Sequence, residues 1–245
     1  MIEVRDLTKV YGALTAVQGL SFSVAAGEIL GLVGPNGAGK TTTLRSLAGI
    51  IRPTRGEIRI AAHDLAQDPI RAKGALAFIP DEPQLFDYLT VGEHLRFTAR
   101  LYRQPETVAD IPAMLAELEL SDKADSLASE LSRGMRQKLA IACGLLHRPA
   151  VLMLDEPLTG LDPLGIRRMK RTIAARAQAG TAVILSSHLL PLVEELCTRV
   201  LIIHRGERVA YGTTAEIAAD RPDLAGRGLE EIFLSLTGQG DAPSP

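Results

Sequence analysis

The strongest chemical pattern in the sequence is the glycine-rich stretch Gly-Pro-Asn-Gly-Ala-Gly-Lys-Thr at residues 34–41. It follows an apolar run at 29–33, which predicts a buried strand, and it precedes a helical run that carries Leu44 and Leu47. Glycines let backbone N–H groups close around phosphate oxygens, lysine meets the β- and γ-phosphate charge, and a hydroxyl binds Mg²⁺. The context favours a nucleotide phosphate site over a glycine-rich structural turn. Its predicted ligands are Gly34, Pro35, Asn36, Gly37, Ala38, Gly39, Lys40, Thr41 and Thr42.

Two adjacent carboxylates, Asp155 and Glu156, follow a second apolar run at 151–154. Open α/β sheets bind ligands at the carboxyl ends of their strands. We expect Asp155 to hold Mg²⁺ through water and Glu156 to polarise the attacking water. An apolar strand ending in Asp-Glu would by itself suit a solvated strand end, but the phosphate loop in the same chain favours catalysis.

A histidine, His188, follows a third apolar run at 182–185. The carboxyl ends of parallel strands meet at one edge of a sheet, so His188 is expected near the acidic pair, within reach of the γ-phosphate. A structural histidine beside a helix cap is the alternative interpretation.

The elements that must position these residues alternate between strand and helix. Short β-rich runs separated by turns fill residues 2–79, and a helical pattern with a capping box at 90–93 follows at about 85–129. Strand-type runs return up to residue 203, and apolar spacing at 229–236 predicts a last helix. Strands separated by helix-length segments indicate an α/β fold with crossover connections and a helical insertion.

Composition excludes several classes of protein. Among 245 residues there are 27 basic and 29 acidic side chains, a net charge of −2, so a broad basic surface for nucleic acid is not expected. Two cysteines fit a reduced, intracellular compartment rather than a disulfide framework. The N-terminus lacks the pattern of a secretion signal, and no segment resembles a membrane span.

A further motif, Leu-Ser-Arg-Gly-Met at residues 131–135, lies about twenty residues before the acidic pair. Together with the phosphate loop, it resembles the signature of ATP-binding cassette (ABC) ATPases. From the residues alone, Ser132 and Gly134 lie just before a predicted helix whose N–H groups would point at an anion, with an ordinary helix N-cap as the alternative. A kinase would share only the phosphate loop.

The resemblance implies a fold and a set of boundaries. It implies an α/β fold with a P-loop NTPase core built on a mixed β-sheet, an antiparallel β subdomain and an α-helical insertion subdomain. We expect a single ABC ATPase domain over 1–237, with core segments 1–84 and 136–237 and an insertion over 85–135. Residues 238–245 are expected to form a disordered tail.

The resemblance also implies ligands and a partner. Tyr11 resembles the aromatic residue that stacks on the adenine of ATP, and Asp162 lies in a stretch similar to the loop that communicates across the dimer. In the family the signature faces the phosphate loop of another ATPase domain. We therefore expect ATP and Mg²⁺ to be bound between this chain and a second ABC ATPase domain, identical or related.

The sequence departs from the family pattern at two places. The usual signature is Leu-Ser-Gly-Gly-Gln, whereas Arg133 and Met135 stand here at its third and fifth positions. The second departure is Asp81, which occupies the position of a glutamine that touches Mg²⁺ and links to the membrane subunit. A carboxylate remains a hard oxygen ligand, so Asp81 is our third candidate for the metal, and Gln84 is its rival.

The signature variant indicates a direction of transport. The run at 134–138 is similar to ATPases of bacterial drug, bacteriocin and polysaccharide-type exporters, and 229–237 resembles their C-terminal helix. We expect an exporter ATPase, cytoplasmic and peripheral on the inner face of the membrane, that binds a separate transmembrane permease and no nucleic acid. The alternative is a soluble ABC ATPase acting on ribosomes or DNA. Candidate residues for the permease groove, or for internal packing of the insertion, are Leu85, Phe86, Tyr88 and Leu89.

Overall fold

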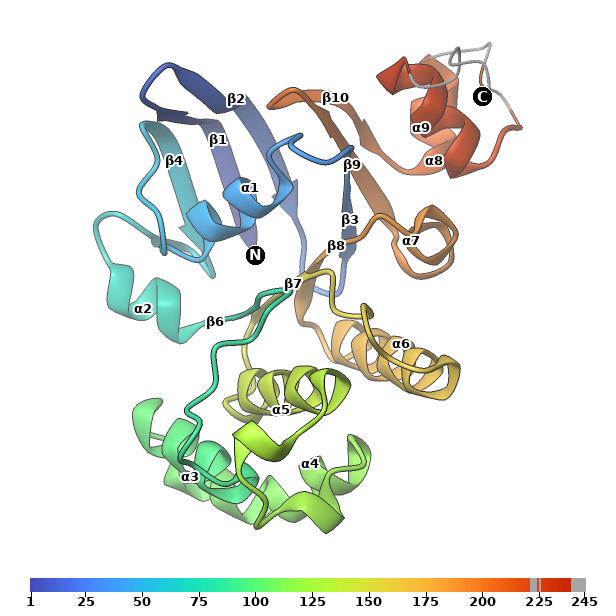
Figure 1. Cartoon of the computed structure of the whole chain (residues 1–245). Coiled ribbons are helices and arrows are strands. Elements are labelled where there is room, and N and C mark those ends of the chain that lie inside the picture. Colours follow the sequence, from blue (N-terminus) through green and yellow to red (C-terminus); the bar gives the residue numbers. More distant parts are fainter. Residues whose placement is uncertain (221–223, 225, 239–245) are drawn as a thin grey trace.

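A computed structural model describes residues 1–220, 224 and 226–238 (Figure 1). A six-stranded mixed sheet forms the centre of the molecule. Five strands are parallel and one edge strand is antiparallel. In spatial order they are β10 (Glu207–Gly212), β9 (Arg199–His204), β3 (Ile29–Val33), β8 (Ala182–Ser186), β7 (Val151–Asp155) and β6 (Leu76–Ile79).

A second, four-stranded sheet is antiparallel throughout. Its long strands alternate buried and exposed residues over much of their length, as expected for a sheet with one face on the core and one in solvent. Its strands in spatial order are β2 (Leu14–Val24), β1 (Ile2–Tyr11), β4 (Arg55–Ile60) and β5 (His63–Asp64).

The inner strands β3, β7 and β8 of the central sheet are buried on both faces, which explains their continuous apolar runs. Val151 and Met153 pack with α1 (Lys40–Leu47) and the antiparallel sheet, whereas Leu152 and Leu154 pack with helices on the other face. The period of two along a strand therefore divides the apolar core into two clusters. Short helix α2 (Pro69–Gly74) leads into β6.

The helical insertion lies at one end of the molecule (Figure 1). The predicted capping box is present, because Thr90 and Glu93 each accept the other's backbone N–H. The proposed boundary at residue 135 falls inside the helix that leads back into the core. The helices of this region are α3 (Val91–Leu101), η1 (Pro105–Asp110), α4 (Ile111–Glu117), η2 (Ser121–Lys123), η3 (Ala128–Glu130) and α5 (Arg133–Leu146).

The remaining helices cover the central sheet and its β10 edge. A third apolar cluster joins the end of β3 to the C-terminal helices. The predicted last helix is confirmed, and the tail expected at 238–245 lies outside the described residues from 239 onward. These helices are α6 (Pro163–Gln178), α7 (Leu190–Leu196), α8 (Thr214–Asp220) and α9 (Leu229–Thr237).

The predicted fold class is confirmed: a mixed α/β core carries an antiparallel sheet and a helical insertion. Within the described ranges, none of the helices is both long and apolar enough to cross a membrane.

Candidate functional site

The phosphate loop connects β3 to α1, and backbone crowding requires its glycines. A Cβ atom on Gly34 would lie 2.4 Å from the carbonyl oxygen of Ile203. Gly39 has φ +104°, and a Cβ atom there would lie 2.5 Å from the carbonyl oxygen of Ala16. Helix α1 starts after Gly39 without a side-chain cap, so its first N–H groups are available to an anion.

The ammonium group of Lys40 lies across this loop. It donates to the carbonyl oxygens of Gly34 at 2.7 Å and Pro35 at 3.2 Å. Burial lowers the pKa of Lys40, while the carboxylates of Glu156 and Asp155 act to raise it. The lysine therefore lies between the loop that would receive phosphate and the acidic pair.

Asp155 and Glu156 occupy two different environments at the end of β7. Asp155 is 4% exposed and accepts a short hydrogen bond from the hydroxyl of Ser186. Glu156 has φ +50°, a left-handed conformation that its N–H supports by donating to the Ser186 carbonyl oxygen at 3.1 Å. This turn at the strand end aims the two neighbouring carboxylates differently.

The expected proximity of His188 to the acidic pair is present. Its Nδ1 lies 2.8 Å from a carboxylate oxygen of Glu156, with the imidazole largely exposed and the carboxylate largely buried. Burial raises the pKa of Glu156, and the neighbouring charges of His188 and Lys40 oppose that rise. A carboxylate that binds protons more readily than usual suits a general base.

An open cleft of about 670 Å³ brings most of the predicted residues together. The exposed ring of Tyr11 forms its outer end, where the ammonium of Lys9 lies 4.7 Å from the ring centroid. Gly34 and Pro35 lie in an adjacent cavity. The predicted residues that line the cleft are Tyr11, Asn36, Gly37, Ala38, Gly39, Lys40, Thr41, Thr42, Asp81, Asp155 and Glu156.

Some residues of the cleft are absent from the sequence-based prediction. Arg205 lines the cleft. It follows β9, a parallel neighbour of β3, and this position at a strand's carboxyl end is the signal that could have identified it. The β1–β2 hairpin contributes the others, Leu14, Thr15 and Ala16.

His188 lines the adjacent cavity with Gly34 and Pro35, and three further predicted residues line neither space. Ser132 caps α5 by accepting from Met135 N–H at 3.3 Å, and Asp162 caps α6 by accepting from Gly165 N–H at 2.9 Å. We expected Gly134 to precede the helix, but it lies in the first turn of α5, which begins at Arg133. A Cβ atom on Gly134 would lie 3.0 Å from the carbonyl oxygen of Gly160, so the signature segment packs on the loop that follows Glu156.

Asp81 and its rival Gln84 both lie near the proposed metal ligands. Asp81 lines the cleft with Thr41 and Asp155, whereas Gln84 lines an adjoining groove that the same three residues also line. The Gln84 amide is directed at the carbonyl oxygen of Glu82, 3.4 Å away. Asp81 also forms an ion pair with Arg133 at 3.3 Å. The two departures from the family pattern are therefore in contact with each other.

A second groove of about 740 Å³ lies between the core and the insertion. Leu85 lines this groove together with Tyr102 and Cys143. Phe86 and Tyr88 are exposed but do not line it, so only one of the four predicted apolar residues contributes to its wall.

A phosphate loop after the parallel strand β3, an acidic pair at the end of β7 in the same sheet and a helical insertion define a P-loop ATPase of the cassette type. Residues 17–159 match the family model described as ABC transporter. The chain is 33% identical to the ABC-type transporter ATP-binding protein EcsA of Bacillus subtilis, over 97% of this chain and 96% of that protein. It is also 38% identical to the Nod factor export ATP-binding protein I of Paraburkholderia xenovorans, over 95% of this chain and 76% of that protein.

A solved structure of an ATP-binding subunit of an ABC transporter has the same fold. Its TM-score is 0.92 at 35% identity, and the match covers 96% of this chain and 99% of that one. The chain belongs to the family of ABC transporter ATP-binding subunits, and it is an ATPase.

Proposed function

We propose that this chain is the ATP-hydrolysing subunit of an ABC exporter and that Glu156 polarises the attacking water. The observation that carries the proposal is the single cleft in which Lys40, Asp155 and Glu156 meet the phosphate loop. Lys40 would neutralise β- and γ-phosphate charge, while Glu156 would accept a proton from water as it attacks.

We propose that Thr41 binds Mg²⁺ through its hydroxyl, that Asp155 holds the ion through water, and that Asp81 contacts it directly or through water. Hydroxyl and carboxylate oxygens are the hard ligands that Mg²⁺ prefers, and all three residues line the cleft. The ion would neutralise negative charge on the triphosphate. The hydroxyl of Ser186 donates a hydrogen bond to Asp155 and so helps to hold this carboxylate in place.

His188 has two roles in this proposal. Its Nδ1 faces Glu156, which leaves Nε2 for an oxygen of the γ-phosphate. It would hold the general base and contact the phosphate group at the same time. Tyr11 would stack on the adenine at the outer end of the cleft.

The remaining site residues support a dimeric arrangement. Ser132 and Gly134 lie at the N-terminus of α5, outside the cleft that Lys40 lines. We propose that they meet the γ-phosphate bound by a second ABC ATPase domain, identical or related, with Asp162 near the interface. A helix N-terminus attracts anions through its N–H groups, which fits this role.

The groove between core and insertion is the proposed docking place of a separate transmembrane permease. Its apolar wall and its continuity with Asp81 would let nucleotide binding affect the permease. The relative named for Nod factor export supports export as the direction of transport. The chain would then be cytoplasmic and peripheral on the membrane, as one domain over 1–237 with its insertion at 85–135.

Dimerisation of a Glu156→Gln variant tests the proposal. The variant should bind ATP without hydrolysing it, and it should elute as a dimer with ATP and Mg²⁺ but as a monomer without them. Strictly monomeric elution with ATP and Mg²⁺ would contradict the dimeric site. Co-purification from solubilised membranes tests the exporter assignment, and recovery only with ribosomes or DNA would instead support the alternative ABC ATPase.

A further inference from the structure

The C-terminal helix α9 reaches the catalytic region through one side chain. Phe233 lines a cavity of about 250 Å³ whose other walls include Pro35 of the phosphate loop and His188. The phenyl ring is 8% exposed and belongs to the apolar cluster that contains Val33, the last residue before the phosphate loop. A residue far along the chain thus forms a wall beside the catalytic histidine.

A specific contact holds α9 in this place. Gly228 at its N-cap has no side chain to offer, and the carboxylate of Glu194 accepts the N–H of Leu229 at 3.1 Å instead. Glu194 lies in α7, which starts two residues after His188. Glu194 thus links α9 to α7, the helix that follows His188 in the chain. Phe233 of α9 lines a cavity together with His188.

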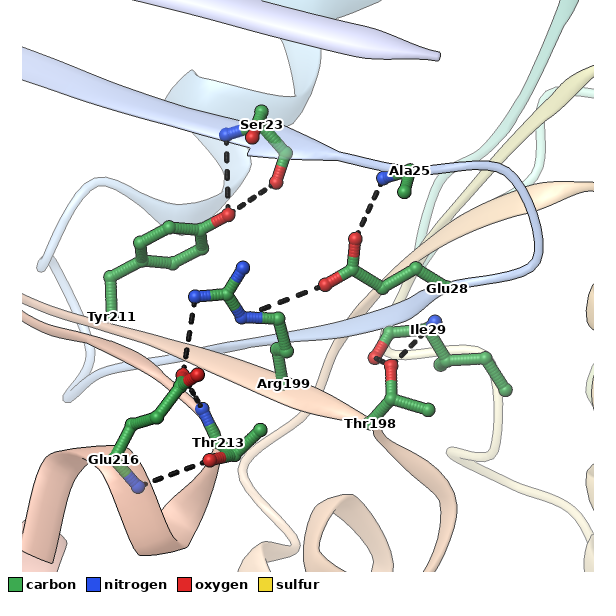
Figure 2. A network of polar contacts seen from close by, with 9 residues as sticks. All are labelled: Ser23, Ala25, Glu28, Ile29, Thr198, Arg199, Tyr211, Thr213 and Glu216. Carbon is green, nitrogen blue, oxygen red and sulfur yellow. Dashed lines mark hydrogen bonds and ion pairs between the residues drawn. The ribbon is translucent and has the colours of Figure 1, made fainter.

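A polar network joins α8 to the strands beside it (Figure 2). Arg199 of β9 pairs with Glu28 at 3.7 Å and with Glu216 of α8 at 3.3 Å, and its guanidinium lies 4.4 Å from the ring centroid of Tyr211. The Tyr211 hydroxyl donates to the carbonyl oxygen of Ser23 at 2.5 Å. Strands β2, β9 and β10 and helix α8 are therefore joined in one network.

The imidazole of His188 has few restraints of its own. It is largely exposed, and among the described residues its polar contact is the one with Glu156. A side chain with one hydrogen bond retains rotamer freedom unless a neighbour removes it. Two bulky apolar residues line the same cavity: Leu190, which begins α7, and Phe233, the aromatic residue that α9 contributes.

We propose that Phe233 is a positioning residue that restricts His188 to the conformation in which it holds Glu156 and reaches the γ-phosphate. This inference rests on the proposed function of His188. Removal of the ring leaves the catalytic groups in place but lets the imidazole leave its productive geometry. Misplacement by about 1 Å can lower a rate about a hundredfold.

Kinetics with a matched control test this role. Phe233→Ala should lower kcat about ten- to a hundredfold, with KM for ATP changed less than about twofold, and Phe233→Leu should recover most of the rate. Ile232 is the control, because it is 0% exposed and belongs to the same cluster without lining the cavity. Ile232→Ala, or Ile232→Val if alanine prevents folding, should lower Tm yet leave kcat within about twofold.

A readout that does not need hydrolysis separates this inference from the proposed function. The side-chain ¹⁵N resonances of His188 should shift in ATP-free Phe233→Ala and remain in place in the Ile232 variant. If the wild-type chain hydrolyses no ATP, the proposed function fails, while the resonances still test whether Phe233 positions the imidazole of His188. Equal loss of kcat in both variants, or unmoved His188 resonances in Phe233→Ala, would overturn the positioning role.

Discussion

The residues on the two sides of the nucleotide cleft are held in place to different degrees. On the core side, Asp155 is 4% exposed and bonded to Ser186, and the phosphate loop is constrained by backbone contacts at Gly34 and Gly39. On the insertion side, Asp81 is held by an ion pair with Arg133 whose side chains are 44% and 59% exposed. Exposed pairs contribute at most about 1 kcal/mol, so the core side is preorganised while the insertion side can rearrange at little cost.

The largest effect should come from the core side. Glu156→Gln should lower kcat by about 10²- to 10⁴-fold, because the amide cannot accept the proton of the attacking water. Steady-state ATPase assays measure this loss. Glu195→Gln, an exposed acid of α7, is the matched control and should keep full activity. A kcat of Glu156→Gln within tenfold of the wild type would remove Glu156 as the general base.

Rigidity of the phosphate loop can be tested separately. Gly39→Ala should destabilise the fold by about 1–3 kcal/mol, because φ +104° and the close Ala16 carbonyl both oppose a side chain. Urea unfolding and ATP titration measure the loss. Gly74→Ala, with open space around its Cβ position, should leave stability unchanged or raise it by about 0.4–1 kcal/mol. Equal stability of the two variants would contradict the difference in stiffness.

A smaller effect is expected for the pair on the insertion side. Asp81→Asn and Arg133→Gln should each change stability by less than about 1 kcal/mol, with a coupling energy of the same size in a double-mutant cycle. Asp81→Asn should also raise the Mg²⁺ concentration needed for half-maximal ATPase activity, whereas Gln84→Ala should not. Unchanged Mg²⁺ dependence in Asp81→Asn would remove this residue from the metal site.

The smallest effect concerns pH and stability. Burial raises the pKa of Glu156 in the folded chain above its unfolded value, so ionisation of this carboxyl destabilises the folded state. Glu156→Gln should therefore be more stable than the wild type at pH 7, and the margin should shrink as the pH falls to about 4. Urea midpoints at the two pH values measure this margin, and a margin that grows toward acid would contradict the pKa shift.

Local patterns explain what the sequence predicts well. The strand, loop and helix around residues 29–47 follow from a continuous apolar run, closely spaced glycines and periodic leucines, all within one short stretch. The position of His188 beside Glu156 follows from a general rule about parallel strands. These features require no knowledge of distant contacts.

Long-range packing explains what the sequence does not predict. Asp81 and Arg133 are separated by 52 residues, and their pairing depends on how the insertion folds back on the core. Arg205 enters the cleft because β9 lies beside β3, and Phe233 lines a cavity with His188 because α9 packs on α7. Each contact depends on strand order or helix docking, which spacing along the chain does not encode.

The N-terminus of α1, which has no side-chain cap, offers a way to detect bound nucleotide. Gly39 provides no side-chain cap, and the first N–H groups of the helix lack intrahelical acceptors. Phosphate oxygens would accept hydrogen bonds from these N–H groups. Amide hydrogen exchange at residues 40–42 should therefore slow when nucleotide binds. The residues that bind ATP are then also the residues whose backbone amide protection shows whether ATP is bound.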